Sequence, residues 1–262
     1  MEVFPHLMPF SYWYMKTDEE VLQALSQGEI DMKGEFIWGS NYTFLVEVQQ
    51  NEGHLTAVYK PTRGERPLWD FPTASLARRE AAAYLVSEAL GWRLVPPTIY
   101  RRKGPLGAGS LQLFIPHDPE YNYFTFSEQD RQRLRPAVLF DLLINNADRK
   151  GSHVLRDPDD HFWLIDHGLC FHVEEKLRTV IWDFVGEPIP PDLCTDISEF
   201  IIKVFPSSNS SSEHSGELAE ALQRLISPSE LRALARRAEA LVVSASFPAP
   251  DMSRRPFPWP QI

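Results

Sequence analysis

The stretch Asn145–Gly168, NNADRKGSHVLRDPDDHFWLIDHG, constrains the fold and the chemistry of this chain more than any other. It carries Asp148 and Asp166, each at the end of an apolar run, with a short polar turn between the runs. The pattern predicts a helix that leads into a loop with Asp148. A tight hairpin follows, which turns at residues 157–160 and delivers Asp166 to the same place. Two carboxylates at loop ends suit an enzyme that positions a hydroxyl with one acid and holds a phosphate-bound metal with the other.

The composition limits the classes of protein to which the chain can belong. Its 262 residues, 43% of them hydrophobic, suffice for a packed core in one large domain or two lobes. The 26 basic and 36 acidic residues give a net charge of −10, which argues against a general nucleic-acid binder. The 2 cysteines form no disulfide framework, and we see neither a secretory signal pattern nor an apolar run of the roughly 18 residues that span a membrane. We therefore expect a cytoplasmic protein without an integral membrane segment.

Upstream of this stretch, the sequence places a lysine on a strand and a glutamate on a helix. Two strand-like runs joined by a turn at Asn51–Gly53 predict an antiparallel hairpin, and its second strand, residues 54–61, ends near Lys60. The helical pattern over residues 75–90 contains Glu80. In kinases, a strand lysine paired with a helix glutamate aims an ammonium group at the nucleotide phosphates. The alternative for Glu80 is a solvated helix carboxylate.

Two further segments suit a nucleotide. Gly39, Ser40 and Asn41 form a turn of small residues, where backbone N–H groups can approach phosphate oxygens, although most such turns are only turns. The strand over residues 111–115 runs into a stiff, proline-containing connection. Backbone groups in such a place can pair with an adenine base, but ordinary linkers have the same pattern.

The pattern changes from strands to helices near residue 117. Capping signals predict that helices begin at Thr17, Ser127 and Ser227. The helical run from Ser127 continues to Ala147, and the helix from Ser227 is the second of two predicted between residues 216 and 247. The sequence therefore predicts an α+β, bilobal fold. Its parts are a β-rich N-lobe with one helical N-terminal extension (residues 1–117), a mainly helical C-lobe that holds both acids (residues 118–248), and a proline-rich tail (residues 249–262).

Five motifs along the chain resemble those of one kinase superfamily. They are AVYKP at 57–61, REAAAYLVSEALGWRLVPPT at 79–98, GSLQLFIP at 109–116, NNADRK at 145–150 and LIDHGLCF at 164–171. On these residues the chain resembles the phosphatidylinositol 3-/4-kinase-like superfamily, in particular the catalytic domain of type II phosphatidylinositol 4-kinases. It is more distantly similar to the HipA toxin kinases. The motifs occur in the order of the family, and the resemblance implies a protein-kinase-like fold with a β-rich N-lobe and a mainly helical C-lobe.

The resemblance also implies a role for each candidate residue of the first half. Lys60 contacts the nucleotide phosphates, Glu80 orients Lys60, Gly39, Ser40 and Asn41 cover the phosphates, and Phe114 and Ile115 flank the adenine.

In the second half, the resemblance implies that Asp148 accepts or orients the acceptor hydroxyl. Asp166, in the slot of the family's Asp-x-Gly motif, would hold the metal that bridges the phosphates. His153 stands where the family usually has an asparagine as second metal ligand, and an imidazole suits Mn²⁺ or Zn²⁺ better than Mg²⁺. The implied cofactors are ATP and either Mg²⁺ or Mn²⁺.

Three functions agree with these residues. The first is an ATP-dependent kinase that acts on a protein hydroxyl, an inositol lipid or a small alcohol. We favour a protein hydroxyl, because nothing here resembles the cysteine-rich, palmitoylated insert of the lipid kinases. The second is a nucleotide-binding pseudokinase or regulatory module, in which His153 marks lost metal chemistry. The third is a metal-dependent phosphohydrolase with Asp148, His153, Asp166 and His167 as ligands, which leaves Lys60 without a role.

Overall fold

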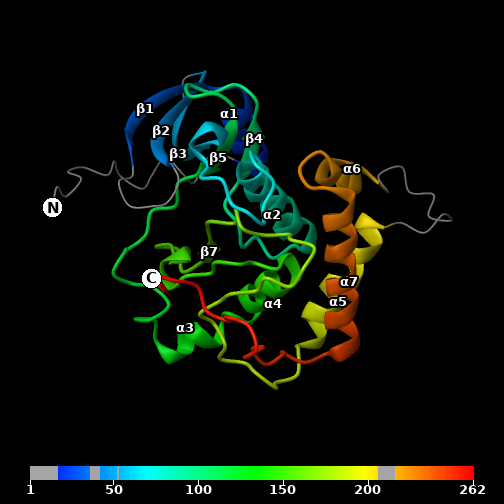
Figure 1. Ribbon diagram of the computed structural model, residues 1–262. Coiled ribbons are helices and arrows are strands. Elements are labelled where there is room, and N and C mark those ends of the chain that lie inside the picture. Colours follow the sequence, from blue (N-terminus) through cyan, green and yellow to red (C-terminus); the bar gives the residue numbers. More distant parts are fainter. Residues whose placement is uncertain (1–16, 36–41, 52, 206–215) are drawn as a thin grey trace.

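The computed structural model describes residues 17–35, 42–51, 53–205 and 216–262 (Figure 1). The predicted α+β class is confirmed, since an antiparallel sheet lies at one end of the molecule and helices make up the other. The elements in chain order are α1 (Asp18–Gln27), β1 (Glu29–Glu35), β2 (Phe44–Gln50), β3 (Gly53–Pro61), the 3-10 turn η2 (Thr62–Gly64), α2 (Leu76–Leu90), β4 (Thr98–Arg101), β5 (Gly109–Leu113), α3 (Glu128–Gln132), α4 (Arg135–Ile144), the 3-10 turn η3 (Gly151–His153), β6 (Val154–Arg156), β7 (Phe162–Leu164), α5 (Pro191–Val204), α6 (Glu217–Gln223) and α7 (Pro228–Ser244).

The larger sheet has the strand order β1-β2-β3-β5-β4, with every pair antiparallel. The predicted hairpin is present as β2 and β3, and Val46 and Val48 turn toward the core while their neighbours stay partly exposed. Strand β1 is not apparent from the sequence, because EIDMKGE is rich in charge. It forms on the sheet edge, where charged side chains are tolerated and only Ile30 and Met32 pack against the core. The candidate turn Gly39–Asn41 lies outside the described residues.

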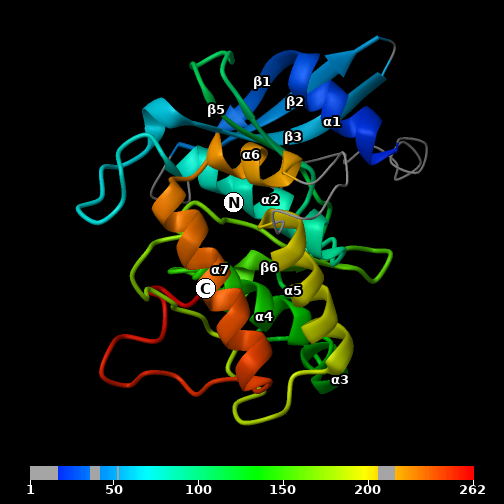
Figure 2. The same cartoon turned by 90° about the vertical axis from the view of Figure 1, so that its right-hand side faces the viewer.

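Helix α2 lies between this sheet and the C-terminal helices (Figure 2). Its alanines Ala82 and Ala83 and its Val86 are fully buried, and small side chains let neighbouring elements approach closely. These residues belong to the larger of the hydrophobic clusters, together with residues of α4, α5 and α7. Gly91 ends the helix in the left-handed conformation, at φ 74°, which glycine adopts without strain. The helix thus connects the sheet to the rest of the molecule.

The C-terminal half differs from the sequence-based expectation at two helices. The single run predicted from Ser127 to Ala147 is two helices, α3 and α4, because Pro136 lies in the first turn of α4 and a proline is not accommodated inside a helix. Helix α5 was not predicted. It buries Leu193, Ile197 and Phe200 along one face, the spacing of an amphipathic helix. The predicted cap of α7 at Ser227 is confirmed.

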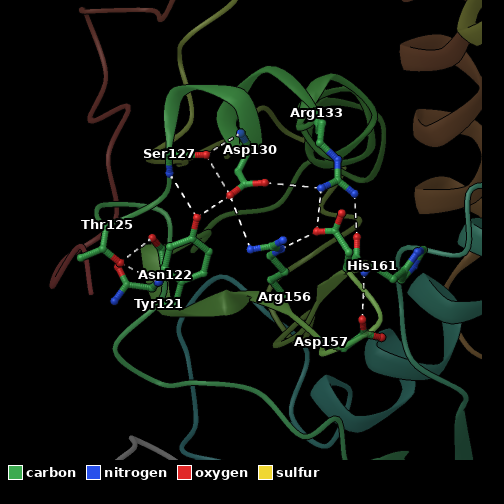
Figure 3. A network of polar contacts seen from close by, with 10 residues as sticks. Tyr121, Asn122, Thr125, Ser127, Asp130, Arg133, Arg156, Asp157 and His161 are labelled. Atoms are coloured by element: carbon green, nitrogen blue, oxygen red, sulfur yellow. Dashed lines mark hydrogen bonds and ion pairs between the residues drawn. The ribbon is translucent and has the colours of Figure 1, made fainter.

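The hairpin that leads to Asp166 is formed by β6 and β7, and its turn closes with the Asp160 N–H donating to the Asp157 oxygen at 3.1 Å. A polar network fixes the turn end of the hairpin to α3 (Figure 3). In it, Asp130 accepts from Ser127 at 3.0 Å and lies 3.8 Å from the Arg156 guanidinium of β6. Because one end of the hairpin is anchored in this way, the direction of the other end is set as well.

We expect the buried face of α5 to contribute strongly to stability. Ile197 is 0% exposed, whereas Ile202 on the same helix is 63% exposed, so the two isoleucines form a matched pair. Ile197→Ala should lower the free energy of unfolding by about 2–5 kcal/mol, since it leaves a cavity. Ile202→Ala should change it by no more than about 0.5 kcal/mol. Urea titrations followed by circular dichroism would measure both, and equal effects would mean that α5 is packed differently.

Candidate active site

The sequence-predicted site residues that the structure describes line one cavity of ≈590 Å³. It lies between the sheet, α2, the loop after α4 and the end of the β6–β7 hairpin. The members of this set are Lys60, Glu80, Phe114, Ile115, Asp148, His153 and Asp166. They come from positions up to 106 residues apart in the chain, so the tertiary structure assembles the set.

Lys60 forms the centre of the charged end of the cavity. Its Nζ lies 2.5 Å from Oε1 of Glu80 and 3.0 Å from Oδ1 of Asp166, so the predicted contact between the strand lysine and the helix glutamate is present. Burial works against the charged form of Lys60, but Asp166 and Glu80 outweigh it and raise the pKa of this ammonium above its usual value. Oε2 of Glu80 also accepts the backbone N–H of His167 at 2.9 Å. One buried carboxylate therefore fixes both the ammonium and the segment that follows Asp166.

A second ion pair fixes α2, the helix that carries Glu80, against α7. The guanidinium of Arg79, next to Glu80, is 1% exposed and donates to Glu230 of α7 and to the backbone oxygen of Cys170. Glu80 and Arg79 thus tie one helix to the sheet on one side and to α7 on the other. We did not identify Arg79 or Glu230 from the sequence, because an ion pair between residues 151 positions apart leaves no local signal.

The two acids are brought together by Arg149, which is fully buried. Its guanidinium pairs with Asp141 of α4, with Nε 2.9 Å from Oδ2, and its Nη1 donates to the backbone oxygen of Ile165 at 2.8 Å. Asp148 precedes Arg149 in the chain, and Asp166 follows Ile165. A single cation therefore ties the loop that carries the first acid to the strand end that carries the second. Asp166 has φ 63°, a left-handed conformation that Asp adopts more readily than most residues.

The surroundings shift the pKa values of the Asp148 and Asp166 carboxyls in opposite directions. Burial, helped by the charge of Asp166, raises the pKa of Asp148 to about 6, although Lys150, 3.5 Å away, opposes the shift. Lys60 is the main reason why the pKa of Asp166 lies below its usual range. Two neighbouring acids with separated pKa values can take different chemical roles, one as a proton acceptor near neutral pH and the other as a permanent anion.

The side chains of Asp166 and His153 suit a divalent cation that takes its other ligands from a bound phosphate and from water. Nε2 of His153 lies 3.3 Å from Oδ2 of Asp166, so a carboxylate and an imidazole converge on one place. Burial lowers the pKa of His153 to about 4, which keeps the ring neutral, as metal binding requires. Within the described ranges no group of three or more His, Cys, Asp or Glu side chains is arranged to hold a metal. These two donors fit Mg²⁺ or Mn²⁺, which take their remaining ligands from phosphate and water.

The same geometry disfavours the four-ligand phosphohydrolase site. His167 is fully buried, and its Nε2 contacts the Arg149 guanidinium at 2.8 Å. Burial and the charge of Arg149 hold the pKa of His167 well below its usual value. The other ring nitrogen, Nδ1, is buried and has no hydrogen-bond partner among the described residues. Those residues nevertheless include no group of three or more His, Cys, Asp or Glu side chains arranged to hold a metal, so Asp148, His153, Asp166 and His167 do not form the four-ligand set. In the part of the chain that the structure describes, no helix has the length and apolar character needed to cross a membrane.

Comparisons with known proteins agree with this geometry at the level of the fold. No family model matches the chain. Protein Rv2133c of Mycobacterium tuberculosis is 39% identical in an alignment of 281 positions, which covers 94% of this chain and 96% of that protein. Phosphatidylinositol 4-kinase gamma 4 of Oryza sativa subsp. japonica is 30% identical in an alignment of 139 positions, which covers 44% of this chain and 24% of that protein.

Among solved structures, the Golgi casein kinase with Mn and ADP bound superposes with a TM-score of 0.53 at 15% identity, over 94% of this chain and 80% of that one. The fold is therefore similar to that of kinases. The high identity to Rv2133c over nearly the whole of both proteins shows that this chain belongs to the family of protein Rv2133c.

Proposed function

We propose that this protein is an ATP-dependent phosphotransferase of the phosphatidylinositol 3-/4-kinase-like type, which moves the γ-phosphate of ATP to a hydroxyl group. The observation that carries the proposal is the Lys60 ammonium, bonded to both Glu80 and Asp166 at the edge of the cavity that Asp148 also lines. Phosphoryl transfer depends mainly on positioning and on neutralising charge, and this arrangement can supply both. The kinase-like fold and the partial match to a phosphatidylinositol 4-kinase support it.

The nucleotide would lie along the cavity from an apolar end to a charged end. Val58, Leu113 and Leu155 line it together with Phe114 and Ile115, which we assign to the adenine. Lys60 would contact the phosphates, and Glu80 would keep its ammonium in place. The assignment of Gly39, Ser40 and Asn41 to the phosphates remains a prediction from the sequence.

Asp166 and His153 are the residues that would hold Mg²⁺ or Mn²⁺. When bound, the metal neutralises charge on the phosphate oxygens. Because imidazole is a better ligand for Mn²⁺ than for Mg²⁺, we expect the protein to work better with Mn²⁺. The Golgi casein kinase was solved with Mn and ADP, in agreement with this preference.

Asp148 would accept the proton of the acceptor hydroxyl. With a pKa of about 6 it is ionised at neutral pH, yet basic enough to take a proton, which is what a general base needs. Below pH 6 it becomes protonated and the transfer should slow. The acceptor is a protein serine or threonine, which we favour, or an inositol lipid.

One hydrogen bond favours a second candidate, a nucleotide-binding module without transfer activity. The Lys150 N–H donates to Nδ1 of His153 at 3.4 Å. A neutral ring that accepts at Nδ1 carries its proton on Nε2, the nitrogen that faces Asp166. In that tautomer His153 donates to Asp166 and does not bind a metal.

Phosphotransfer is tested with γ-labelled ATP in Mg²⁺ or Mn²⁺, with added protein and lipid acceptors. We expect labelling by the unaltered protein and a decrease of about 10²–10³-fold or more in Lys60→Met and Asp166→Asn, because each removes a charge placed at the phosphates. Glu199→Gln, on the exposed face of α5, is the control and should label normally. Label that persists in both site variants would contradict the assigned roles. Nucleotide-dependent thermal stabilisation without label in either metal would favour the second candidate.

The raised pKa of Asp148 also predicts a change in stability. Its folded pKa of about 6 lies above the value of about 3.9 expected in the unfolded chain, so the ionised carboxylate destabilises the fold above pH 6. Asp148→Asn should therefore raise the free energy of unfolding at pH 7–8 by about 2–3 kcal/mol while abolishing transfer. The gain should shrink as the pH falls from 6 to 4 and approach zero below about pH 4, where the aspartate is protonated in the folded and in the unfolded chain. Urea titrations across this pH range, with Glu199→Gln as control, measure it, and a gain independent of pH would refute the electrostatic cause.

A further inference from the structure

A second cavity, of ≈460 Å³, lies apart from the candidate active site. It is lined by α7, by the segment of residues 175–182 and by the C-terminal segment of residues 246–256. The C-terminal segment follows α7 and passes below α4 in Figure 1. None of the functions considered above uses this cavity.

The lining of the second cavity is cationic, although the chain as a whole is acidic. Five basic side chains and two acidic ones line it: Lys176, Arg178, Arg237, Arg254 and Arg255, with Glu175 and Asp251. Lys176 and Arg254 are engaged, with Asp70 at 3.2 Å and with Asp251 at 3.4 Å. Within the described part of the chain, the Arg178 side chain has no hydrogen bond or ion pair. The cavity therefore has positive charge that the protein itself does not neutralise.

Two buried donors in this lining lack an acceptor. Nη2 of Arg237 and Nε1 of Trp182 are buried and have no hydrogen-bond partner among the described residues. The rest of the Arg237 guanidinium is fixed, because its Nε donates to the Leu143 oxygen at 2.8 Å and its Nη1 to the His172 oxygen at 3.2 Å. Buried donors in native proteins are almost always paired, so these two indicate an acceptor that the chain does not provide.

Arg237 keeps its charge in this environment. Burial lowers its pKa to about 10, while Glu175 acts in the opposite direction. At neutral pH the group is therefore a buried cation with a donor to spare. A guanidinium with donors fixed in a plane is well suited to an oxyanion, and several cations around one cavity favour an anion with more than one charge.

The second cavity adjoins the loop that carries Asp148. The Arg178 N–H donates to the Asn146 oxygen, and the Arg178 oxygen accepts the Arg149 N–H, both at 2.9 Å. These two bonds lie on either side of Asp148 in the sequence. The charge of Arg178 is also one of the influences that lower the pKa of Asp148. An anion bound at Arg178 would therefore offset this charge and change the electrostatic environment of Asp148.

We propose that the second cavity binds a small molecule that carries a phosphate group, with Arg178, Trp182 and Arg237 as the donors to its oxygens. This site does not depend on the phosphotransfer proposed above. It places a phosphate-bearing ligand next to the Asp148 loop, outside the cavity assigned to the nucleotide.

The test measures binding of pyrophosphate and inorganic phosphate to the full chain by isothermal titration at constant ionic strength. We expect saturable binding. The affinity should fall about tenfold or more in Arg178→Gln and severalfold in Trp182→Phe, because each change removes hydrogen bonds to a charged group. Neither side chain forms a hydrogen bond or ion pair among the described residues, so neither change breaks one. Arg232→Gln, at an exposed position of α7 outside this lining, is the matched control and should bind normally.

A second measurement separates this site from the candidate active site, where Lys60 is also able to attract phosphate. The indole N–H resonance of Trp182, assigned by its absence in Trp182→Phe, should shift on titration with pyrophosphate, and the shift should persist in Lys60→Met. Absence of binding, equal affinity in all variants, or an unmoved indole resonance would each overturn the proposal. Loss of transfer activity in Lys60→Met would leave this result unaffected, so the two proposals fail separately.

Discussion

The candidate active site depends on one buried cation, Arg149. A guanidinium that is wholly removed from water must be paired, and here Asp141 on α4 supplies the partner. Its Nη1 donates to the backbone oxygens of His153 and Ile165, on either side of the hairpin that leads to Asp166. Removing one partner of such a pair typically costs about 3–5 kcal/mol, so the loop and the hairpin have little freedom to separate. Arg149 therefore holds the segment that carries Asp148 next to the segment that carries Asp166.

Helix α2 completes the arrangement from the other side. Its consecutive residues Arg79 and Glu80 are both buried, and they point to different partners, Glu230 of α7 and Lys60 of β3. Because the alanine-rich helix also packs tightly between sheet and helices, the position of Glu80 is fixed by contacts on two sides. Lys60 is therefore held in place before any ligand arrives, and groups held in this way need no reorganisation when charge develops on a substrate.

Burial gives the two acids different properties although they are the same residue type. Asp166 lies beside the Lys60 ammonium and stays ionised, whereas Asp148 is half-buried, and burial raises its pKa to about 6 although Lys150 and Arg178 oppose the shift. The segment that pairs with the Asp148 loop, around Arg178, also lines the cationic second cavity. The loop that carries Asp148 and the second cavity are thus connected through the backbone of one short segment around Arg178.

Local patterns of residues were enough to predict most of the helices and strands and to single out the charged residues of the site. Caps at Thr17, Ser127 and Ser227 are local signals, as are the turn of the β2–β3 hairpin and the turn of the β6–β7 hairpin, and each is found where it was predicted. The strand lysine and the helix glutamate were also recognisable, since each lies within a clear pattern. Three other features depend on the folded chain: the edge strand β1, the ion pair of Arg79 with Glu230, and the contacts by which Arg149 joins the segments of the two acids. The unpaired donors around the second cavity are a fourth such feature. These features rest on contacts between segments far apart in the chain, and the free energy of such contacts depends on burial and distance, which local patterns of residues do not record.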